Sequence, residues 1–150
     1  MKRAGFTMIE LIFVIVILGI LAAVAIPKLA ATRDDAKIAK DASEVSTAIQ
    51  DLASYYTSQG EFGKLGDMTN VKFVTTQDGT TDAANTDMNG TTVYYNDSNN
   101  NSCLHFTTTA TDGNLTVTSD SNATTECKGL NAATEDLAKT HQFGGSGVKW

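Results

Sequence analysis

Sixteen consecutive residues near the amino terminus, Leu11 to Ile26, contain nothing more polar than glycine. From Phe6 to Ile26 the segment has 21 residues, which is about 31 Å of α-helix and close to the thickness of a bilayer's hydrocarbon core. The residue just before the run is an acid, Glu10, and a carboxylate costs roughly 2.5 to 3.5 kcal/mol at a bilayer centre. The segment therefore predicts a membrane-capable helix whose acid needs a partner.

Charge on either side of the apolar run predicts its orientation. Lys2 and Arg3 precede it, and positive flanking residues stay on the cytoplasmic side of a membrane. We therefore expect a cytoplasmic amino terminus and an exported remainder. The formal net charge is −6, which argues against direct nucleic-acid binding because that normally needs a basic patch.

The residues after the apolar run continue a helical pattern. Between Lys28 and Ser58 there is no Gly or Pro, and apolar residues recur every three or four positions, at Ile38, Ala42, Val45, Ile49, Leu52 and Tyr56. We predict one nearly continuous helix from Phe6 to about Ser58, with the charged residues, Asp41 and Glu44 among them, largely on other faces. A secretory signal cleaved after Ala25 would discard this helix, and a plain membrane anchor would leave the acid at its head unexplained.

The stretch GFTMIELIFVIVILGILAAVAIP, Gly5 to Pro27, resembles the start of type IV prepilin-like proteins, the superfamily of type IV pilins and type II secretion pseudopilins. The resemblance implies that a membrane prepilin peptidase cuts between Gly5 and Phe6, and that the new terminal amine of Phe6 is methylated. It also implies that the Glu10 carboxylate accepts the Phe6 amine of a neighbouring subunit when the helices stack into a filament. Such a pair enforces register, because an unpaired buried charge is strongly disfavoured.

Pro27, the single proline of the chain, falls inside the expected helix. It removes the hydrogen bond to the carbonyl of Ala23 at a cost of about 3 kcal/mol. We therefore expect a kink or a loosened segment between Gly19 and Pro27. The alternative is a helix that simply ends at Ile26.

The predicted fold class is α+β, and the resemblance implies a pilin-like lollipop in which the long helix packs on a small antiparallel sheet. Its parts are a leader (1–5), the helix (6–58, of which 6–26 spans the membrane before assembly) and a β-rich head (59–150). Strand-forming runs occur at Val71–Val74, Thr92–Tyr95, Cys103–Phe106 and Leu115–Thr118. Asp112-Gly113 suits a hairpin turn, Asn131 a cap for a short helix through Lys139, and Phe143, Val148 and Trp150 a return to the core.

Two cysteines, Cys103 and Cys127, lie 24 positions apart in the part expected outside the cytoplasm, where a disulfide is the favoured state. Many pilins tie their carboxyl-terminal region in this way. A zinc site that combines these cysteines with His105 and His141 is the competing hypothesis, but it lacks the close paired spacing of a structural site. The stretch from Asn85 to Gly90 resembles a calcium loop without its leading acid and closing Glu. We predict neither a metal nor a cofactor.

The sequence contains no compact catalytic constellation. The expected function is therefore the one that the resemblance implies. We expect a non-enzymatic filament subunit whose partners are its own copies, the prepilin peptidase, the inner-membrane assembly platform with its minor pilins or pseudopilins, and membrane lipid before assembly. The resemblance implies that the subunit is held in the bacterial inner membrane before assembly. We expect the filament to be a periplasmic pseudopilus of the type II secretion or competence kind, or alternatively a surface pilus for adhesion or motility. From another class, a monomeric secreted or membrane-anchored binding module stays open.

Three Asn-x-Thr triplets, at Asn89, Asn114 and Asn122, each have Asp two positions before the Asn. Such acidic triplets are glycosylated on exported proteins of some bacteria. The segment is rich in Thr, Asn and Asp, so chance is the competing explanation.

Overall fold

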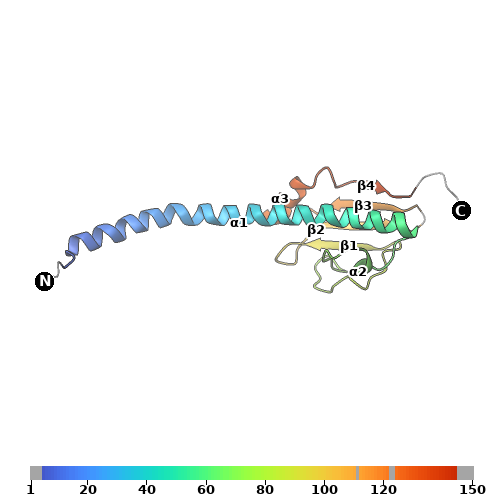
Figure 1. The fold of residues 1–150 in the computed structure, drawn as a ribbon, viewed down its shortest axis with the longest axis horizontal. Helices are drawn as coiled ribbons and strands as arrows, with labels where there is room; N and C mark the ends of the chain where they lie inside the picture. Colours follow the sequence, from blue (N-terminus) through green and yellow to red (C-terminus); the bar gives the residue numbers. More distant parts are fainter. Residues whose placement is uncertain (1–4, 111, 122–123, 145–150) are drawn as a thin grey trace. The chain divides into compact units, whose positions relative to one another are not determined.

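The structure is a computed structural model that describes residues 5–110, 112–121 and 124–144. Its contacts divide the chain into two units, Met1–Ala36 and Lys37–Trp150. The elements follow one another along the chain (Figure 1) as α1 (Met8–Gln59), α2 (Leu65–Met68), β1 (Thr92–Asn96), β2 (Ser102–Thr109), β3 (Asn114–Ser119), α3 (Thr125–Ala133) and β4 (Thr140–Gln142).

Helix α1 is continuous through Pro27, so the alternative that the helix ends at Ile26 is wrong. It begins at Met8 rather than at Phe6, and it ends one residue later than expected. Gly60 follows with φ 81° and donates its N–H to the carbonyl oxygen of Tyr56 at 2.8 Å. A glycine in the left-handed region is a common helix stop because it lacks the Cβ that makes this conformation strained.

The four strands form one antiparallel sheet in the order β1-β2-β3-β4, and the second half of α1 packs on it, which confirms the α+β prediction (Figure 1). Val93, Phe106 and Val117 stand in register on three neighbouring strands and are at most 2 % exposed. They share the core with four buried residues of α1, namely Val45, Ala48, Ile49 and Leu52. Burial of this apolar stripe therefore stabilises the helix and the sheet together.

The other face of the sheet is polar. Four threonines stand in one row across all four strands: Thr92, Thr107, Thr116 and Thr140. Their hydroxyls pair across the strands, at 2.8 Å between β1 and β2 and at 3.0 Å between β3 and β4. β-Branched side chains suit a pleated surface, and cross-strand hydroxyl pairs add to its stability, so this composition matches a sheet with one face toward water.

Three of the predicted strands and the hairpin turn are confirmed, whereas the run from Val71 to Val74 is not a strand. Val74 alone makes isolated bridges there, to Asp82 and to Tyr94. The predicted helix from Asn131 to Lys139 is also wrong. The cap of α3 lies seven residues before the predicted cap Asn131, because the Thr124 hydroxyl accepts the N–H of Cys127 at 3.2 Å.

Aromatic residues close the core at the end of α1. The ring centroids of Tyr56 and Phe62 are 4.8 Å apart, and Phe143 lies 6.3 Å from Phe62. Phe143 therefore returns to the core as the sequence predicts. The other two residues expected to return, Val148 and Trp150, and the triplet asparagine Asn122 lie outside the described residues.

Candidate functional site

The expected cleavage point lies immediately before α1. Gly5, Phe6 and Thr7 are exposed and precede the helix, and the Phe6 side chain is 85 % exposed. Exposed segments outside regular structure are the preferred sites of proteolysis. The peptide bond between Gly5 and Phe6 is therefore accessible in the described chain.

Glu10 has a partner within its own chain. Its Oε2 accepts the backbone N–H of Thr7 at 2.8 Å and the Thr7 hydroxyl at 2.7 Å, and the N–H of Glu10 reaches the same hydroxyl oxygen at 3.4 Å. This reciprocal arrangement is a capping box, whose sequence signature is Ser or Thr followed three positions later by Glu or Gln. The signal was present as Thr7-Met8-Ile9-Glu10, but sequence reasoning gave the acid only an intermolecular role.

The capping box leaves part of the carboxylate available. Both of its bonds end on Oε2, and among the described residues none ends on Oε1. A carboxylate can accept on both oxygens at once. Glu10 can therefore receive a cationic group from outside while it still caps its own helix.

The first half of α1 presents a large apolar surface. All sixteen large apolar side chains from Phe6 to Leu29 are at least 40 % exposed in the single chain. By length and composition this helix is able to cross a membrane. An exposed apolar surface of this extent requires lipid or other protein to cover it.

Acidic residues on the second half of α1 fasten it to the sheet. The buried hydroxyl of Tyr95 on β1 lies 2.8 Å from Oε2 of Glu44 and 3.2 Å from Oδ1 of Asp41. Further along the helix, the Asp51 carboxylate accepts the hydroxyl of Thr69 at 2.8 Å. Asp41 and Glu44 lie beside the apolar stripe rather than on it, as expected, but their contacts with Tyr95 were not predicted.

The two carboxylates at Tyr95 have opposite pKa shifts. Burial raises the pKa of Asp41, and the hydrogen bond from Tyr95 only partly offsets it. Burial also opposes charge on Glu44, but hydrogen bonds from Lys40, at 2.5 Å, and from Tyr95 outweigh it and lower the pKa. Since the Tyr95 hydroxyl has one proton, it serves the nearer Glu44 and leaves Asp41 the poorer site for a negative charge.

Replacing Asp41 with Asn is expected to raise the free energy of unfolding at pH 7 by about 0.5 kcal/mol. A carboxyl whose pKa is raised by folding loses stability as the pH rises from its ordinary pKa through the raised one. Asn carries no charge, and its side-chain N–H can donate to the Tyr95 hydroxyl oxygen while the Tyr95 proton still serves Glu44. Urea unfolding of both proteins at pH 7 and pH 3 should show this gain shrinking at the lower pH. Asp34→Asn, at an exposed position of the same helix, is the control. A less stable D41N at pH 7 would contradict the assignment.

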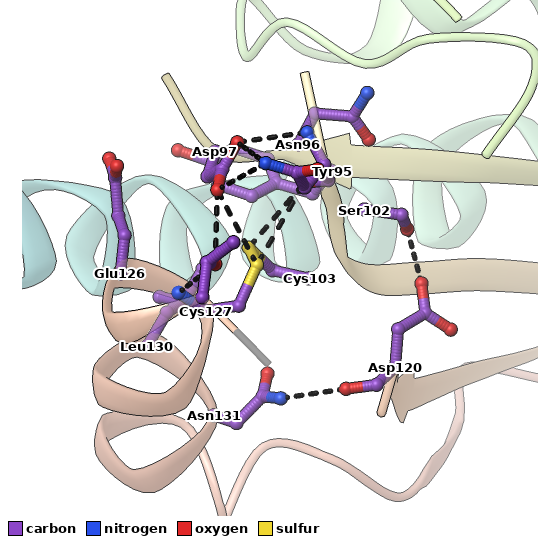
Figure 2. Close-up of a disulfide and its surroundings, with 12 residues drawn as sticks. Tyr95, Asn96, Asp97, Ser102, Cys103, Asp120, Glu126, Cys127, Leu130 and Asn131 are labelled. Carbon is purple, nitrogen blue, oxygen red and sulfur yellow. Dashed lines mark hydrogen bonds between the residues drawn. A yellow bond between two sulfur atoms is a disulfide. The ribbon is translucent and has the colours of Figure 1, made fainter. Parts of the chain in front are cut away.

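The predicted disulfide between Cys103 and Cys127 is confirmed (Figure 2). It joins the start of β2 to α3, with both residues fully buried and 4.8 Å between the Cα atoms. The sulfurs are therefore not thiolate ligands for the alternative zinc site. The two histidines of that site also have other partners, since His105 bonds Asp120 at 2.8 Å and His141 bonds the carbonyl oxygen of Leu137 at 2.9 Å.

Asp97, a residue the sequence reasoning missed, organises the surroundings of the disulfide (Figure 2). Asp97 is 6 % exposed, and its carboxylate accepts the backbone N–H groups of Asn99 and Asn101, each at 2.8 Å, and the hydroxyl of Thr124 at 3.1 Å. Burial alone would raise the pKa of Asp97, but these hydrogen bonds outweigh it and lower the pKa. The loop before β2 is thereby tied to the cap of α3.

A serine, a histidine and an aspartate also meet at the edge of this region. Asp120 accepts the hydroxyl of the buried Ser102 and bonds Nδ1 of His105. In a nucleophile–base pair the serine hydroxyl would donate to the histidine. Here it donates to the aspartate, so the group ties β2 to the end of β3 and does not activate a nucleophile.

Comparison with known proteins finds a family model that matches the amino terminus of the chain. Residues 1–26 fit a family model described as the prokaryotic N-terminal methylation motif. No curated protein and no solved structure matches the chain. The match covers the exposed bond after Gly5, the capping box and most of the apolar surface of α1.

Proposed function

We propose that this chain, which carries the prepilin motif of type IV pilins and pseudopilins in residues 1–26, is a structural subunit of a type IV pilus-like filament. The observation that carries the proposal is the combination of that motif with an apolar helix surface that is exposed among the described residues of the single chain. Lipid covers the segment from Phe6 to Ile26 before assembly, and the same segments of neighbouring subunits cover it afterwards. Lys2 and Arg3 keep the amino terminus cytoplasmic until then.

Processing creates the assembly-competent chain. The inner-membrane prepilin peptidase cuts between Gly5 and Phe6, and methylation follows on the amine of Phe6. Cutting there removes the leader but keeps the apolar helix attached to the head. In this it differs from cleavage after Ala25, which would release the head as a secreted binding module.

The amino-terminal peptide of the protein purified from its native envelope is expected to begin at Phe6 and to carry one methyl group. Mass spectrometry of the tryptic peptide that ends at Lys28 measures both features. Gly5→Leu is the control, because a side chain at the cleavage position should obstruct the protease groove and leave the leader attached. A terminus at Ile26 would instead indicate a secreted protein, and an uncut terminus a plain anchor.

The Glu10 carboxylate takes the Phe6 amine of a neighbouring subunit in the filament. The free Oε1 supports this role, because the amine can bind there without first breaking the capping box. The pair acts mainly on register, since a subunit inserted out of step would leave both charges unpaired in an apolar surrounding. Loosening of α1 between Gly19 and Pro27 remains a prediction, which hydrogen exchange on assembled filaments would test.

Within this class we favour a major pseudopilin of the type II secretion or competence kind, with a surface pilin for adhesion or motility as the alternative. The presence of Glu10 favours a principal subunit over a tip-initiating one. The assembly platform and minor subunits are the further partners. Deleting the gene and measuring secreted proteins, DNA uptake and surface filaments in parallel separates these roles.

A further inference from the structure

The head contains five Asn-x-Ser/Thr triplets, and they fall into two groups. Three have Thr in the third position and Asp two positions before the Asn, namely Asn89, Asn114 and Asn122. Two have Ser and no acid there, namely Asn96 and Asn100. About one residue in twelve of the whole chain is Asp. All three Thr triplets have Asp two positions before the Asn, and neither Ser triplet does. The Asp content of the chain alone does not favour this pattern.

Asn89 is presented at the corner of a turn. It is exposed and lies between the buried Met88 and Gly90, whose φ is 79°. The turn is held from both sides, because Met88 donates its N–H to the carbonyl oxygen of Gly63 at 3.0 Å and its own carbonyl accepts the hydroxyl of Thr108. Gly90 has no side chain that could cover its neighbour, so the Asn89 amide is open to an approaching enzyme.

The acid of this triplet is held beside the acceptor. Oδ1 of Asp87 accepts the backbone N–H of Asn89 at 2.9 Å, and the residue is exposed. A fixed, exposed carboxylate next to the acceptor amide is a recognition group for a cationic pocket. Asp87 and Asn89 therefore reach the surface as one unit.

Of the other triplets with a described structure, Asn100 is exposed but its triplet has Ser and no acid, and Asn114 and Asn96 are presented less well. Asn114 is half-buried at the start of β3, where it pairs with Thr109 on one side and Gln142 on the other. The amide nitrogen of Asn96 already donates to the carbonyl oxygens of Gly79 and Asn100, at 3.2 Å and 3.3 Å. Neither of these two asparagines is exposed at a turn as Asn89 is.

From this placement we infer that Asn89 is the acceptor of an N-linked glycan on the folded, exported head. The donor is an oligosaccharide linked to a lipid diphosphate, and the catalyst is an envelope oligosaccharyltransferase. The amide nitrogen of Asn89 forms a bond to the anomeric carbon of the first sugar. The bond from that carbon to the diphosphate breaks, the lipid diphosphate leaves, and one amide proton is lost, so no oxidant or reductant is needed. The inference rests on the export that the proposed function requires.

The test is mass spectrometry of the protein from its native envelope. Lys72 and Lys128 bound a tryptic peptide that contains all five triplets, and fragmentation assigns the modified asparagine. We expect a glycan mass on Asn89, which Asn89→Gln removes and Asn96→Gln leaves unchanged. Detection of the bare peptide alone, or of a glycan on Asn114 or Asn122 without one on Asn89, would overturn the inference.

Two pairs of variants separate recognition from folding. Asp87→Asn keeps a side-chain oxygen for the N–H of Asn89 but removes the charge, and should abolish the glycan, whereas Asp87→Glu should keep it. Thr91→Val should likewise abolish the glycan and Thr91→Ser keep it. Full occupancy in both D87N and T91V would refute recognition of the triplet.

The same sample reports on the proposed function independently. A methylated Phe6 without a glycan would defeat only the glycan inference. A glycan on Asn89 with an amino terminus at Ile26 would defeat only the filament proposal, since a secreted head also reaches the transferase.

Discussion

Replacing Glu10 with Gln is expected to abolish filament assembly while the head stays folded. The Gln side-chain oxygen still accepts the N–H of Thr7, so the capping box survives. The negative charge is lost, and the Phe6 amine of the neighbour is then buried without a counter-charge. Breaking one partner of a buried pair costs about 3 to 5 kcal/mol per contact, enough to reduce the equilibrium for adding a subunit by more than a hundredfold. Electron microscopy of sheared filaments and fractionation of the membrane pool measure the effect.

Thr7→Ala is the matched control for this experiment. It removes the cap at a cost of about 1 kcal/mol but keeps the Glu10 charge, so filaments should still form. If E10Q assembled normally and T7A did not, Glu10 would be a helix cap and not an assembly contact. Normal filaments in both variants and in Glu10→Ala would show that assembly does not depend on the Glu10 charge, whereas the absence of filaments from the unmodified chain would support the monomeric alternative.

Replacing both Cys103 and Cys127 with Ala is expected to lower the free energy of unfolding of the head by about 3.5 kcal/mol, the chain-entropy value for a closed loop of 25 residues. The expectation depends on the bridge joining two separate elements, β2 and α3. Without it, α3 is held to the sheet chiefly through Leu130 and through the bonds of Asp97 and Asn131. Urea unfolding of the mature chain in detergent, followed by circular dichroism, measures the loss.

Reduction provides the control for the cysteine variant. The wild-type protein unfolded in the presence of a reductant should approach the stability of the double variant, and the double variant itself should not respond to the reductant. A loss below about 1 kcal/mol would mean that the contacts of Asp97 hold α3 in place without the bridge.

The sequence predicted the fold best where a periodic pattern of apolar residues continued over many turns. The apolar stripe of α1 extends over many turns, so a single chance residue could not disguise it, and its buried members Val45, Ile49 and Leu52 were predicted correctly. Three strands were likewise visible from their β-forming residues. The run from Val71 to Val74 has the same composition, but only Val74 finds a partner, and pairing depends on segments distant in sequence that composition does not reveal.

Helix α3 shows why local signals can mislead. Both Thr124 and Asn131 are residue types that cap helices, and the sequence offered no means of choosing between them. In the fold Asn131 lies within the helix and donates its amide to the carbonyl oxygen of Asp120 at 3.0 Å. Strand β4 has three residues and is defined only by its pairing with β3, so it was missed.

The acids on α1 were the main omission at the candidate site. A helical wheel places Asp41 and Glu44 beside the apolar stripe, and whether such residues are solvated or bound depends on what the sheet presents to them. Tyr95 was expected in a strand. The face of the sheet that its side chain occupies depends on the strand register, which the sequence alone did not determine. The capping box, by contrast, was a purely local signal.

The capping box has a consequence for subunits that leave a filament. A chain returned to the membrane with a bare carboxylate at the head of its apolar helix would be held poorly by lipid and exposed to degradation. Because Thr7 hydrogen-bonds that carboxylate within the same chain, a withdrawn subunit needs no second molecule to accommodate it. Under the proposed function, the same contact serves a subunit in the membrane before it joins a filament and after it leaves one.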